Sequence, residues 1–266
     1  MSRLILGRTP GGVDVTIDPT EAAHTLFTGQ TRSGKSVQVY GALAQLPRAG
    51  VQVCGIDPTG ILFNALGDQL GGDALRVLTL SDPEQVEHVM LELVAEMDRR
   101  IRALLAKRLD KFTDFTTELP LLIVLMEEYP GTLAALQAID AASGARPVDR
   151  LETKVRAAIQ RLALEGAKVG VRLWLVAQRA DASLLTGVLR SQLTQRFSFR
   201  QDPDGLRMLH ETITPEQIDR AQSFPVGRAY AEIASNPAPV EYQADYISYQ
   251  MLTSRFAQAQ TAEALP

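Results

Sequence analysis

The sequence predicts an α/β fold in which a mostly parallel central sheet carries helices on both faces. Three observations predict it. Short runs rich in Val, Ile and Leu alternate with amphipathic stretches, which is typical of strands joined by crossover helices. Several runs are apolar throughout, as expected for strands covered on both faces. With 266 residues, 45 % hydrophobic and 22 % charged, the chain can form one sizeable globular domain.

Six segments are expected to form the strands. Each is short and apolar, and polar or turn-forming residues bound it. Because helical stretches separate them, neighbouring strands are expected to run in the same direction. In chain order the segments are residues 23–29, 51–57, 75–80, 119–127, 171–178 and 195–200.

Three helices are expected between these strands, over residues 36–46, 81–109 and 150–168. The second has Ser81 as its expected N-cap and Pro83 in its first turn, and its apolar residues recur with a helical period. We expect one domain over residues 1–250. The remaining tail, residues 251–266, is expected to be frayed or a short helix.

Composition excludes several classes of protein. Cys54 has no partner cysteine, which excludes a disulfide scaffold and fits a reducing cytosol. The longest apolar run, residues 119–126, is far shorter than the roughly 20 residues that cross a bilayer. We therefore expect a cytoplasmic protein with no membrane segment of its own. The net charge of −4 gives no support to DNA coating, although a local basic stripe is sufficient for DNA binding.

The stretch GQTRSGKS, from Gly29 to Ser36, matches the complete phosphate-binding loop pattern. Its glycines allow a tight turn that directs backbone N–H groups at an anion, and the following helix adds its positive N-terminus. Lys35 can reach the β- and γ-phosphates, and the Ser36 hydroxyl can ligate Mg²⁺. The alternative is a glycine turn that merely caps a helix. We expect ATP with Mg²⁺, contacted by Gly29, Gln30, Thr31, Arg32, Ser33, Gly34, Lys35, Ser36 and Val37.

A buried strand that ends in two acids is the expected partner of this loop. The apolar run at residues 119–126 is followed directly by Glu127 and Glu128. We expect Glu127 to complete the Mg²⁺ shell and Glu128 to orient and deprotonate the attacking water. Asp is more common at the metal position, so Glu127 is a departure. The alternative is an apolar strand followed by a solvated acidic turn.

The next buried strand, residues 171–177, ends at Gln178. An amide both donates and accepts hydrogen bonds, so Gln178 suits a side chain that senses the γ-phosphate beside the carboxylate strand. A polar residue that simply ends a strand is the alternative. The three histidines have no metal-ligand spacing, and no Ser/His/Asp arrangement can be recognised. We assign them no catalytic role.

Taken together, these motifs resemble the motor domain of the FtsK/SpoIIIE family of DNA-pumping ATPases. The resemblance covers about residues 4–247, and EEYP at residues 127–130 leans toward the branch found in plasmid transfer and mobile elements, with phage and HerA-like relatives near. It implies a RecA-like P-loop fold and a homo-oligomeric ring, a hexamer, that moves double-stranded DNA. The segments that carry it, in order, are AHTLFTGQTRSGKSV, GIDPTGILF, LVAEMDRRIRAL, LLIVLMEEYP, VGVRLWLVAQRA and LLTGVLRSQLTQRFSFR.

The resemblance also implies roles for individual residues. Lys35, Glu128 and Gln178 fall at the nucleotide-loop lysine, the catalytic Glu and the sensor Gln, as their spacing suggests. Asp57 falls at an acidic residue after the second strand, where relatives usually continue with Lys and this chain has Thr59. The loop that relatives use to touch DNA corresponds here to Thr186, Gly187 and Arg190.

The position of the family's trans-acting arginine holds Ala167 here. The remaining candidates for this role are Arg161 and Lys168 close by, and Arg196 near the next strand. Arg32 replaces a usually small residue of the phosphate loop, from which it could reach a phosphate or a neighbouring subunit.

Two segments are candidate DNA contacts, because both are expected to begin just past catalytic strands. Residues 142–150 carry Arg146 and Arg150, and residues 182–191 carry Arg190. Arginine contacts to phosphate are independent of base sequence, as a pump requires. The alternative for both is a solvated basic surface.

Three functions therefore stay open at this stage. The first is an ATP-driven motor for double-stranded DNA in plasmid, phage or other mobile-element transfer. The second is a P-loop ATPase that powers protein secretion or pilus assembly. The third is a nucleotide-dependent scaffold with little turnover, which Glu at the metal position would favour.

Overall fold

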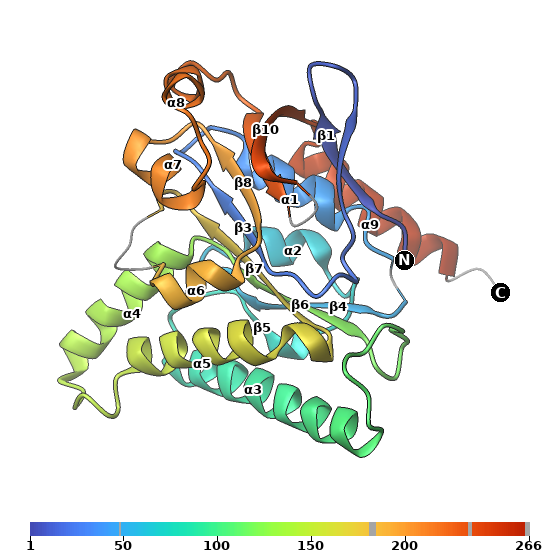
Figure 1. The fold of residues 1–266 in the computed structure, drawn as a ribbon. Coiled ribbons are helices and arrows are strands. Elements are labelled where there is room, and N and C mark those ends of the chain that lie inside the picture. The colour runs from blue at the N-terminus through green and yellow to red at the C-terminus, as the bar shows by residue number, and fades with distance from the viewer. Residues whose placement is uncertain (48, 181–184, 234–235, 264–266) are drawn as a thin grey trace.

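The computed structural model describes residues 1–263 except 48, 181–184 and 234–235. Over these residues the chain forms a ten-stranded sheet in the order β2-β1-β10-β9-β8-β3-β7-β6-β4-β5, with helices on both of its faces (Figure 1). The strands are β1 Leu4–Arg8, β2 Asp14–Ile17, β3 Thr25–Thr28, β4 Val51–Ile56, β5 Arg76–Val77, β6 Leu121–Met126, β7 Val171–Ala177, β8 Gln195–Phe199, β9 Arg228–Ile233 and β10 Asn236–Ala244.

The helices lie between these strands as the alternation of the sequence predicts. The α-helices are α1 Lys35–Leu43, α2 Ile61–Leu66, α3 Pro83–Ala106, α4 Tyr129–Ser143, α5 Leu151–Glu165, α6 Gly187–Gln192, α7 Pro203–Leu209, α8 Pro215–Gln222 and α9 Tyr249–Glu263. Two short 3₁₀ turns, η1 Asp73–Leu75 and η2 Ala167–Val169, precede β5 and β7.

The half of the sheet from β8 to β5 is parallel. All six expected strands lie in it, which confirms the predicted α/β class. Every residue of β3, β6 and β7 is buried, since helices cover both faces of these strands. The segment at residues 75–80 is shorter than expected, because only Arg76 and Val77 pair with β4.

The other half of the sheet is antiparallel and was not predicted. The hairpin β1–β2 and the ribbon β9–β10 extend the sheet beyond β8. Their strands are partly exposed. In β1, for example, Ile5 and Arg8 are exposed. These strands therefore lack the continuous apolar runs that mark the parallel strands. Short alternating segments of this kind give a weaker signal in a sequence.

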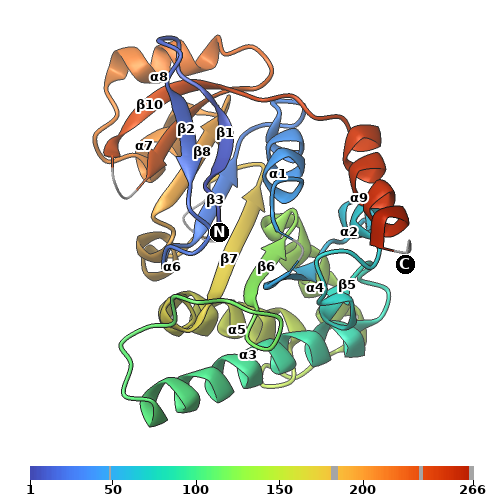
Figure 2. The same cartoon turned by 90° about the vertical axis from the view of Figure 1, so that its right-hand side faces the viewer.

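Two large hydrophobic cores fill most of the space between the sheet and its helices, and a third, smaller one with Leu206, Ile218 and Phe224 lies at α7 and α8. One packs beneath α3, α4, α5 and α6, and the other lies under α1, α2 and α9 on the opposite face (Figure 2). Trp174 of β7 belongs to the second core, where it meets Phe27 edge to face with ring centroids 5.9 Å apart. The middle strands are therefore held from both sides, which fixes the positions of the loops that follow them.

Two details of the helices differ from expectation. The N-cap of α3 is Asp82, which accepts from Gln85 N at 3.1 Å, because the Ser81 hydroxyl lies 3.1 Å from Thr79 Oγ1 instead. The division expected at residue 250 falls inside α9, where Leu252 and Phe256 are buried in the second core. The chain from 251 to at least 256 is thus packed against the domain, and residues 264–266 lie outside the described part.

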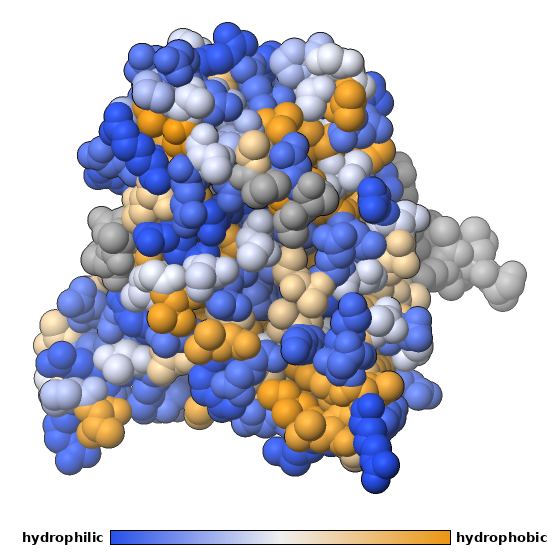
Figure 3. Space-filling view, in the orientation of Figure 1, coloured by the Kyte–Doolittle hydropathy of each residue, from blue (hydrophilic) through white to orange (hydrophobic). Residues whose placement is uncertain are grey.

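The face seen in Figure 3 is mostly hydrophilic with scattered apolar side chains, which gather most at its lower right, over the end of α3. Leu105 and Leu109, at and just after that end, are 68 % and 47 % exposed. Within the described residues, no helix combines the length and the apolar character that spanning a membrane requires.

Candidate nucleotide-binding site

Three neighbouring parallel strands deliver the predicted site residues to one edge of the sheet. Strand β3 pairs with β7, and β7 pairs with β6. Their C-terminal ends lead into the phosphate loop, Gln178 and the acid pair respectively. Parallel strands end at the same edge, and the crevice there is the usual ligand site of an open α/β sheet.

The phosphate loop is pinned from several sides. Gly29 N donates to Ala177 O at 3.3 Å, Gln30 N to Arg200 O at 2.8 Å, and Gly227 N to Ser33 O at 2.9 Å. A Cβ on Gly29 would lie 2.6 Å from Phe199 Cβ, at a φ of 146°. Only glycine therefore allows this close approach to β8.

Lys35 points back into its own loop. Its Nζ donates to Gly29 O at 2.5 Å and to Gln30 O at 3.2 Å. Burial lowers the pKa of this ammonium, and the charges of Glu128 and Glu127 oppose that shift. The lysine thus lies within the electrostatic field of the acid pair, and its ammonium is held by carbonyl oxygens of the loop.

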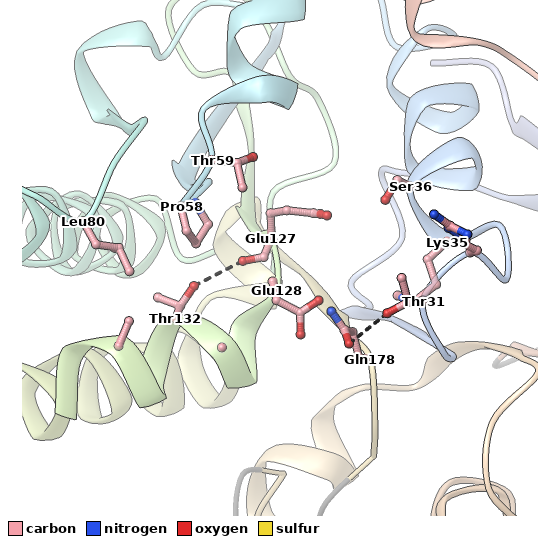
Figure 4. Close-up of a pocket in the computed structure, with 13 residues that line it drawn as sticks. Thr31, Lys35, Ser36, Pro58, Thr59, Leu80, Glu127, Glu128, Thr132 and Gln178 are labelled. Carbon is pink, nitrogen blue, oxygen red and sulfur yellow. Dashed lines mark hydrogen bonds between the residues drawn. The ribbon is translucent and has the colours of Figure 1, made fainter. Parts of the chain in front are cut away.

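A cavity of about 440 Å³ lies between the loop and the acid pair. Figure 4 shows Thr31, Lys35 and Ser36 on one side and Glu127 and Glu128 on the other, with Gln178 below and between them. Residues after β4, Pro58 and Thr59, close the far wall. The predicted nucleotide residues Thr31, Arg32, Lys35 and Ser36 line this cavity, and Arg32, Gly34, Lys35, Ser36 and Val37 line a second hollow on the other side of the loop.

The carboxylate of Glu127 has an oxygen with no partner in the described part of the chain. Its Oε2 is buried and has no hydrogen-bond partner in the described part of the molecule. Burial raises the pKa of Glu127 to about 7, and the nearby Asp57 and Glu128 add to the shift while Lys35 opposes it. A cation would supply the missing partner. The residues therefore fit Mg²⁺, which takes one or two protein oxygens and keeps waters and phosphate oxygens.

Glu128 has a strained backbone. Its φ and ψ are 49° and 52°, in the left-handed region, at the N-cap of α4. Such a conformation in a residue other than glycine costs about 1–3 kcal/mol and is concentrated at functional sites. Gly131 leaves room for the carboxylate, because a Cβ there would lie 3.0 Å from Glu128 Cγ. The turn thereby places the second acid on the cavity wall rather than in the helix.

Gln178 is joined to the phosphate loop directly. Thr31 Oγ1 donates to Gln178 Oε1 at 3.1 Å (Figure 4), so a shift of the loop changes the partner of this amide.

Thr132 is a cavity residue that was not predicted. Its Oγ1 donates to Glu127 O at 3.2 Å and its side chain lines the cavity, and a Thr one turn into a helix gives no distinctive sequence signal.

Asp57 supports the fold around the site. Its Oδ2 accepts from Leu62 N at 2.7 Å and from Phe63 N at 3.3 Å, at the start of α2. Its Oδ1 accepts from Thr59 N and Thr59 Oγ1 at 3.1 and 2.9 Å. The carboxylate is thus fully used in holding the loop that carries Pro58 and Thr59.

Two of the three candidates for a trans-acting cation are engaged within the chain. Arg161 forms ion pairs of 2.7 Å with Asp98 and 2.9 Å with Glu165. Arg196 pairs with Glu232 at 2.9 Å and its side chain is only 12 % exposed. Lys168, in η2, is exposed and no hydrogen bond or ion pair of its side chain is found in the described part.

The first candidate DNA loop does not follow a catalytic strand, so that expectation was wrong. Helix α4 has 15 residues and separates β6 from residues 144–150, a distance of about 22 Å along a helix axis. Arg146 pairs with Asp149 at 2.7 Å on the surface. Arg150 is exposed beside a hollow that Asp140 and Glu152 also line, an acidic setting that disfavours phosphate.

The second candidate loop does follow β7. Residues 182–184 of it lie outside the described residues, and α6 begins at Gly187. Thr186 caps this helix by accepting from Leu189 N at 3.3 Å. Gly187 is exposed and Arg190 is half-buried. This segment thus remains directly connected to the strand that carries Gln178.

A model of the FtsK/SpoIIIE family matches residues 2–182, which include the loop, the acid pair and Gln178. The chain belongs to the FtsK/SpoIIIE family. Among curated family members, DNA translocase FtsK of Staphylococcus aureus is 25 % identical over 213 residues, covering 73 % of this chain and 25 % of the relative. DNA translocase SpoIIIE of Bacillus subtilis is 26 % identical over 212 residues, covering 73 % and 24 %. The chain spans about a quarter of the length of these relatives.

Solved structures share the fold of this family member. The pCW3 conjugation coupling protein TcpA, solved with ATPγS, gives a TM-score of 0.72 at 21 % identity, covering 97 % of this chain and 70 % of TcpA. The type VII secretion ATPase EccC of Thermomonospora curvata gives 0.69 at 20 % identity, covering 96 % and 30 %. These likenesses confirm the predicted RecA-like P-loop fold.

Proposed function

We propose that this FtsK/SpoIIIE family member is a Mg²⁺-dependent ATPase that uses ATP hydrolysis to move double-stranded DNA. The observation that carries the proposal is the single cavity in which the loop lysine, the acid pair and Gln178 meet. Its volume of about 440 Å³ falls in the range of small-molecule sites. Family relatives named DNA translocases support the choice of DNA as the track.

The chemistry assigned to each residue follows from its position. On nucleotide binding, Lys35 Nζ exchanges the carbonyls of Gly29 and Gln30 for β- and γ-phosphate oxygens. Ser36 and Glu127 would hold Mg²⁺, which neutralises phosphate charge. Glu128 takes the proton of the attacking water. Gln178 is released from Thr31 and hydrogen-bonds the γ-phosphate or that water.

The motor is proposed to act as a homo-oligomeric ring, a hexamer, with nucleotide between subunits. Arg161 and Arg196 are neutralised by carboxylates of their own chain, which leaves Lys168 as the candidate cation for a neighbouring site. We place the DNA contact at Thr186, Gly187 and Arg190, because this segment is joined to the sensor strand. The proposed setting is the transfer of plasmid or other mobile-element DNA.

ATP turnover measured with and without linear duplex DNA tests the proposal. We expect DNA to stimulate turnover, and Lys35→Ala to abolish it both with and without DNA. Turnover that ignores DNA would instead support a protein-moving ATPase, and nucleotide binding without turnover would support a scaffold. Arg190→Ala should weaken DNA stimulation and spare basal turnover, whereas Arg146→Ala, on the distant loop, should change neither.

A further inference from the structure

A buried row of polar side chains runs below the phosphate loop, and the nucleotide pocket makes no use of it. Ser198 Oγ lies 2.7 Å from His210 Nε2, and His210 Nδ1 lies 2.7 Å from Glu232 Oε2. The order is hydroxyl, imidazole, carboxylate. The three residues come from β8, the end of α7 and β9, so their spacing in the sequence gives no sign that they meet.

The row is not a hydrolytic site. Ser198 is 0 % and His210 1 % exposed, so no substrate can reach the hydroxyl. Ser198 Oγ has a second neighbour, Thr28 Oγ1, at 3.2 Å. The single proton of the hydroxyl is therefore used inside the protein, in a hydrogen bond to His210 or to Thr28.

The upper end of the row touches the start of the phosphate loop. Thr28 is the last residue of β3, directly before Gly29, and it pairs in register with Ser198. Gln201 Nε2 donates to Thr28 Oγ1 at 3.1 Å, and Arg200 O accepts from Gln30 N at 2.8 Å. A movement of the loop therefore acts directly on Thr28 and on the end of β8.

The lower end of the row holds α6. Glu232 Oε1 accepts from Arg196 Nη1 at 2.9 Å. The same guanidinium donates through Nη2 to Arg190 O at 3.1 Å and through Nε to Leu193 O at 2.8 Å. These carbonyls lie at the C-terminal end of α6, which favours a cation. Glu232 thus holds Arg196 in place, and Arg196 in turn holds the C-terminal end of α6.

The hydrogen bonds of the row form an unbroken chain. A carboxylate can only accept, so His210 Nδ1 donates to Glu232. The other ring nitrogen, Nε2, shares a hydrogen bond with the Ser198 hydroxyl, which also meets the Thr28 hydroxyl. Because each hydroxyl has one proton, displacement of Thr28 changes the partner of Ser198 and then of the imidazole.

We propose that Ser198, His210 and Glu232 are positioning residues that couple nucleotide in the phosphate loop to the placement of α6. Nucleotide binding shifts the loop and Thr28, and the buried row transmits this shift to Arg196 and the carbonyls it holds. The proposal rests on the proposed function in one respect, which is that α6 contacts the DNA. It makes the row, rather than the loop after β7 alone, a route between the two sites.

Amide hydrogen exchange over residues 185–193, with and without Mg²⁺–ATPγS, tests the coupling without any turnover. The informative variant is Glu232→Gln, which keeps the shape of the side chain and removes the charge that holds Arg196. Its matched control is Glu241→Gln. Glu241 is 14 % exposed against 13 % for Glu232, and it pairs with Arg228 at 2.6 Å and with Arg220, neither of which belongs to the row. His210→Phe is the second test variant.

We expect ATPγS to alter exchange in α6 of the wild type and of Glu241→Gln, and this response to be lost in Glu232→Gln and His210→Phe. DNA stimulation of turnover should fall about fivefold or more in the two row variants, with basal turnover unchanged. If His210→Phe fails to fold by circular dichroism, Glu232→Gln alone decides.

Two results would overturn the coupling. One is an α6 of the wild type that does not respond to ATPγS, and the other is a Glu232→Gln variant that keeps the wild-type response. Failure of the proposed function is visible separately, as wild-type turnover that is indifferent to DNA. In that case the exchange measurement still tests whether nucleotide and α6 are linked.

Discussion

The two ends of the central parallel strands differ in how completely their buried polar groups are hydrogen-bonded. In the described part of the chain, five buried side-chain polar atoms lack a hydrogen-bond partner. One of them, Arg172 Nε, lies at the N-terminal end of β7. The other four follow the C-terminal ends of β3, β6 and β8, and belong to Ser33, Glu127, Tyr129 and Gln201.

At the N-terminal ends, most buried polar groups are paired. His24 Nε2 lies 3.0 Å from Ala163 O, and its Nδ1 accepts from Leu173 N at 2.9 Å. Arg100 is 1 % exposed, and it binds Glu96 at 2.6 Å and the carbonyl of Val169 at 3.2 Å. These side chains hold backbone groups that would otherwise be buried alone.

This difference indicates that the C-terminal ends of the strands serve function and the N-terminal ends serve stability. The C-terminal ends also contain Arg32 and Glu128, two of the four non-glycine residues with positive φ in the described part. Unpaired groups and backbone strain are concentrated at functional sites, and of these residues Arg32, Glu127 and Glu128 line the cavity. Changes at this end should therefore alter chemistry, and changes at the other end should alter folding.

The largest effect is expected from Glu128→Gln. Removal of a general base typically lowers turnover about 10²–10⁴-fold, and here the free energy of unfolding should hardly change, since the carboxylate lines an open cavity. Single-turnover hydrolysis and ATPγS binding measure the two parts. Wild-type turnover in this variant would move the catalytic base to another residue.

Arg100→Ala should destabilise the fold by about 3 kcal/mol, because it leaves buried carbonyls and part of Glu96 unpaired. Arg99 is the matched control. It binds the same Glu96 at 2.7 Å but its side chain is 60 % exposed, so Arg99→Ala should cost under about 1 kcal/mol. Urea unfolding compares the variants. Equal losses would show that burial of Arg100 adds nothing.

The pH dependence of stability should report on His24. Burial lowers the pKa of His24 to about 4 from 6.5, and the charge of Arg172 contributes. Between these values the unfolded chain binds a proton that the folded chain does not. Stability is therefore highest above pH 6.5 and falls by up to about 3 kcal/mol as the pH drops to about 4.

Unfolding of the wild type and of His24→Gln, compared across this range, isolates the contribution. The difference between the two curves should grow smaller toward low pH, since Gln carries no proton there. A constant difference would mean that His24 titrates alike in the folded and unfolded chain.

The smallest effect is expected from Arg32→Gly. Arg32 has a φ of 64° and an exposed side chain, so glycine relieves the strain of the left-handed conformation and loses no buried contact. The greater freedom of glycine in the unfolded chain offsets part of the gain, which leaves about 1 kcal/mol or less. Thermal unfolding measures it. A loss of stability would show that Arg32 makes a contact that the fold needs.

The parallel half of the sheet was predictable because each of its signals is local. A buried strand covered on both faces is a continuous apolar run, and the loop pattern lies within one contiguous stretch from Gly29 to Ser36. The antiparallel half was missed because β1, β2 and β9 are partly exposed and, like β10, lack the continuous apolar runs of the parallel strands. Helix α9 was expected only as a frayed tail or a short helix, and its packing was not predicted, because its buried Leu252 and Phe256 stand among polar and small residues.

The candidate site divides in the same manner. Lys35, Glu128 and Gln178 could be predicted as site residues because each follows an apolar run at a defined spacing. The ion pairs of Arg161 with Asp98 and of Arg196 with Glu232 could not be predicted, because the partners are 63 and 36 residues apart in the sequence. The row from Ser198 through His210 to Glu232 was hidden for the same reason.

By itself, then, the sequence determined the strand–helix alternation, the phosphate loop and the polar residues that end β6 and β7, because these depend on near neighbours in the chain. Only the tertiary structure decided which of the charged side chains stay available. Pairing in space depends on sheet order, and the antiparallel ribbon that brings Glu232 beneath the loop can be placed only once the strands are assembled.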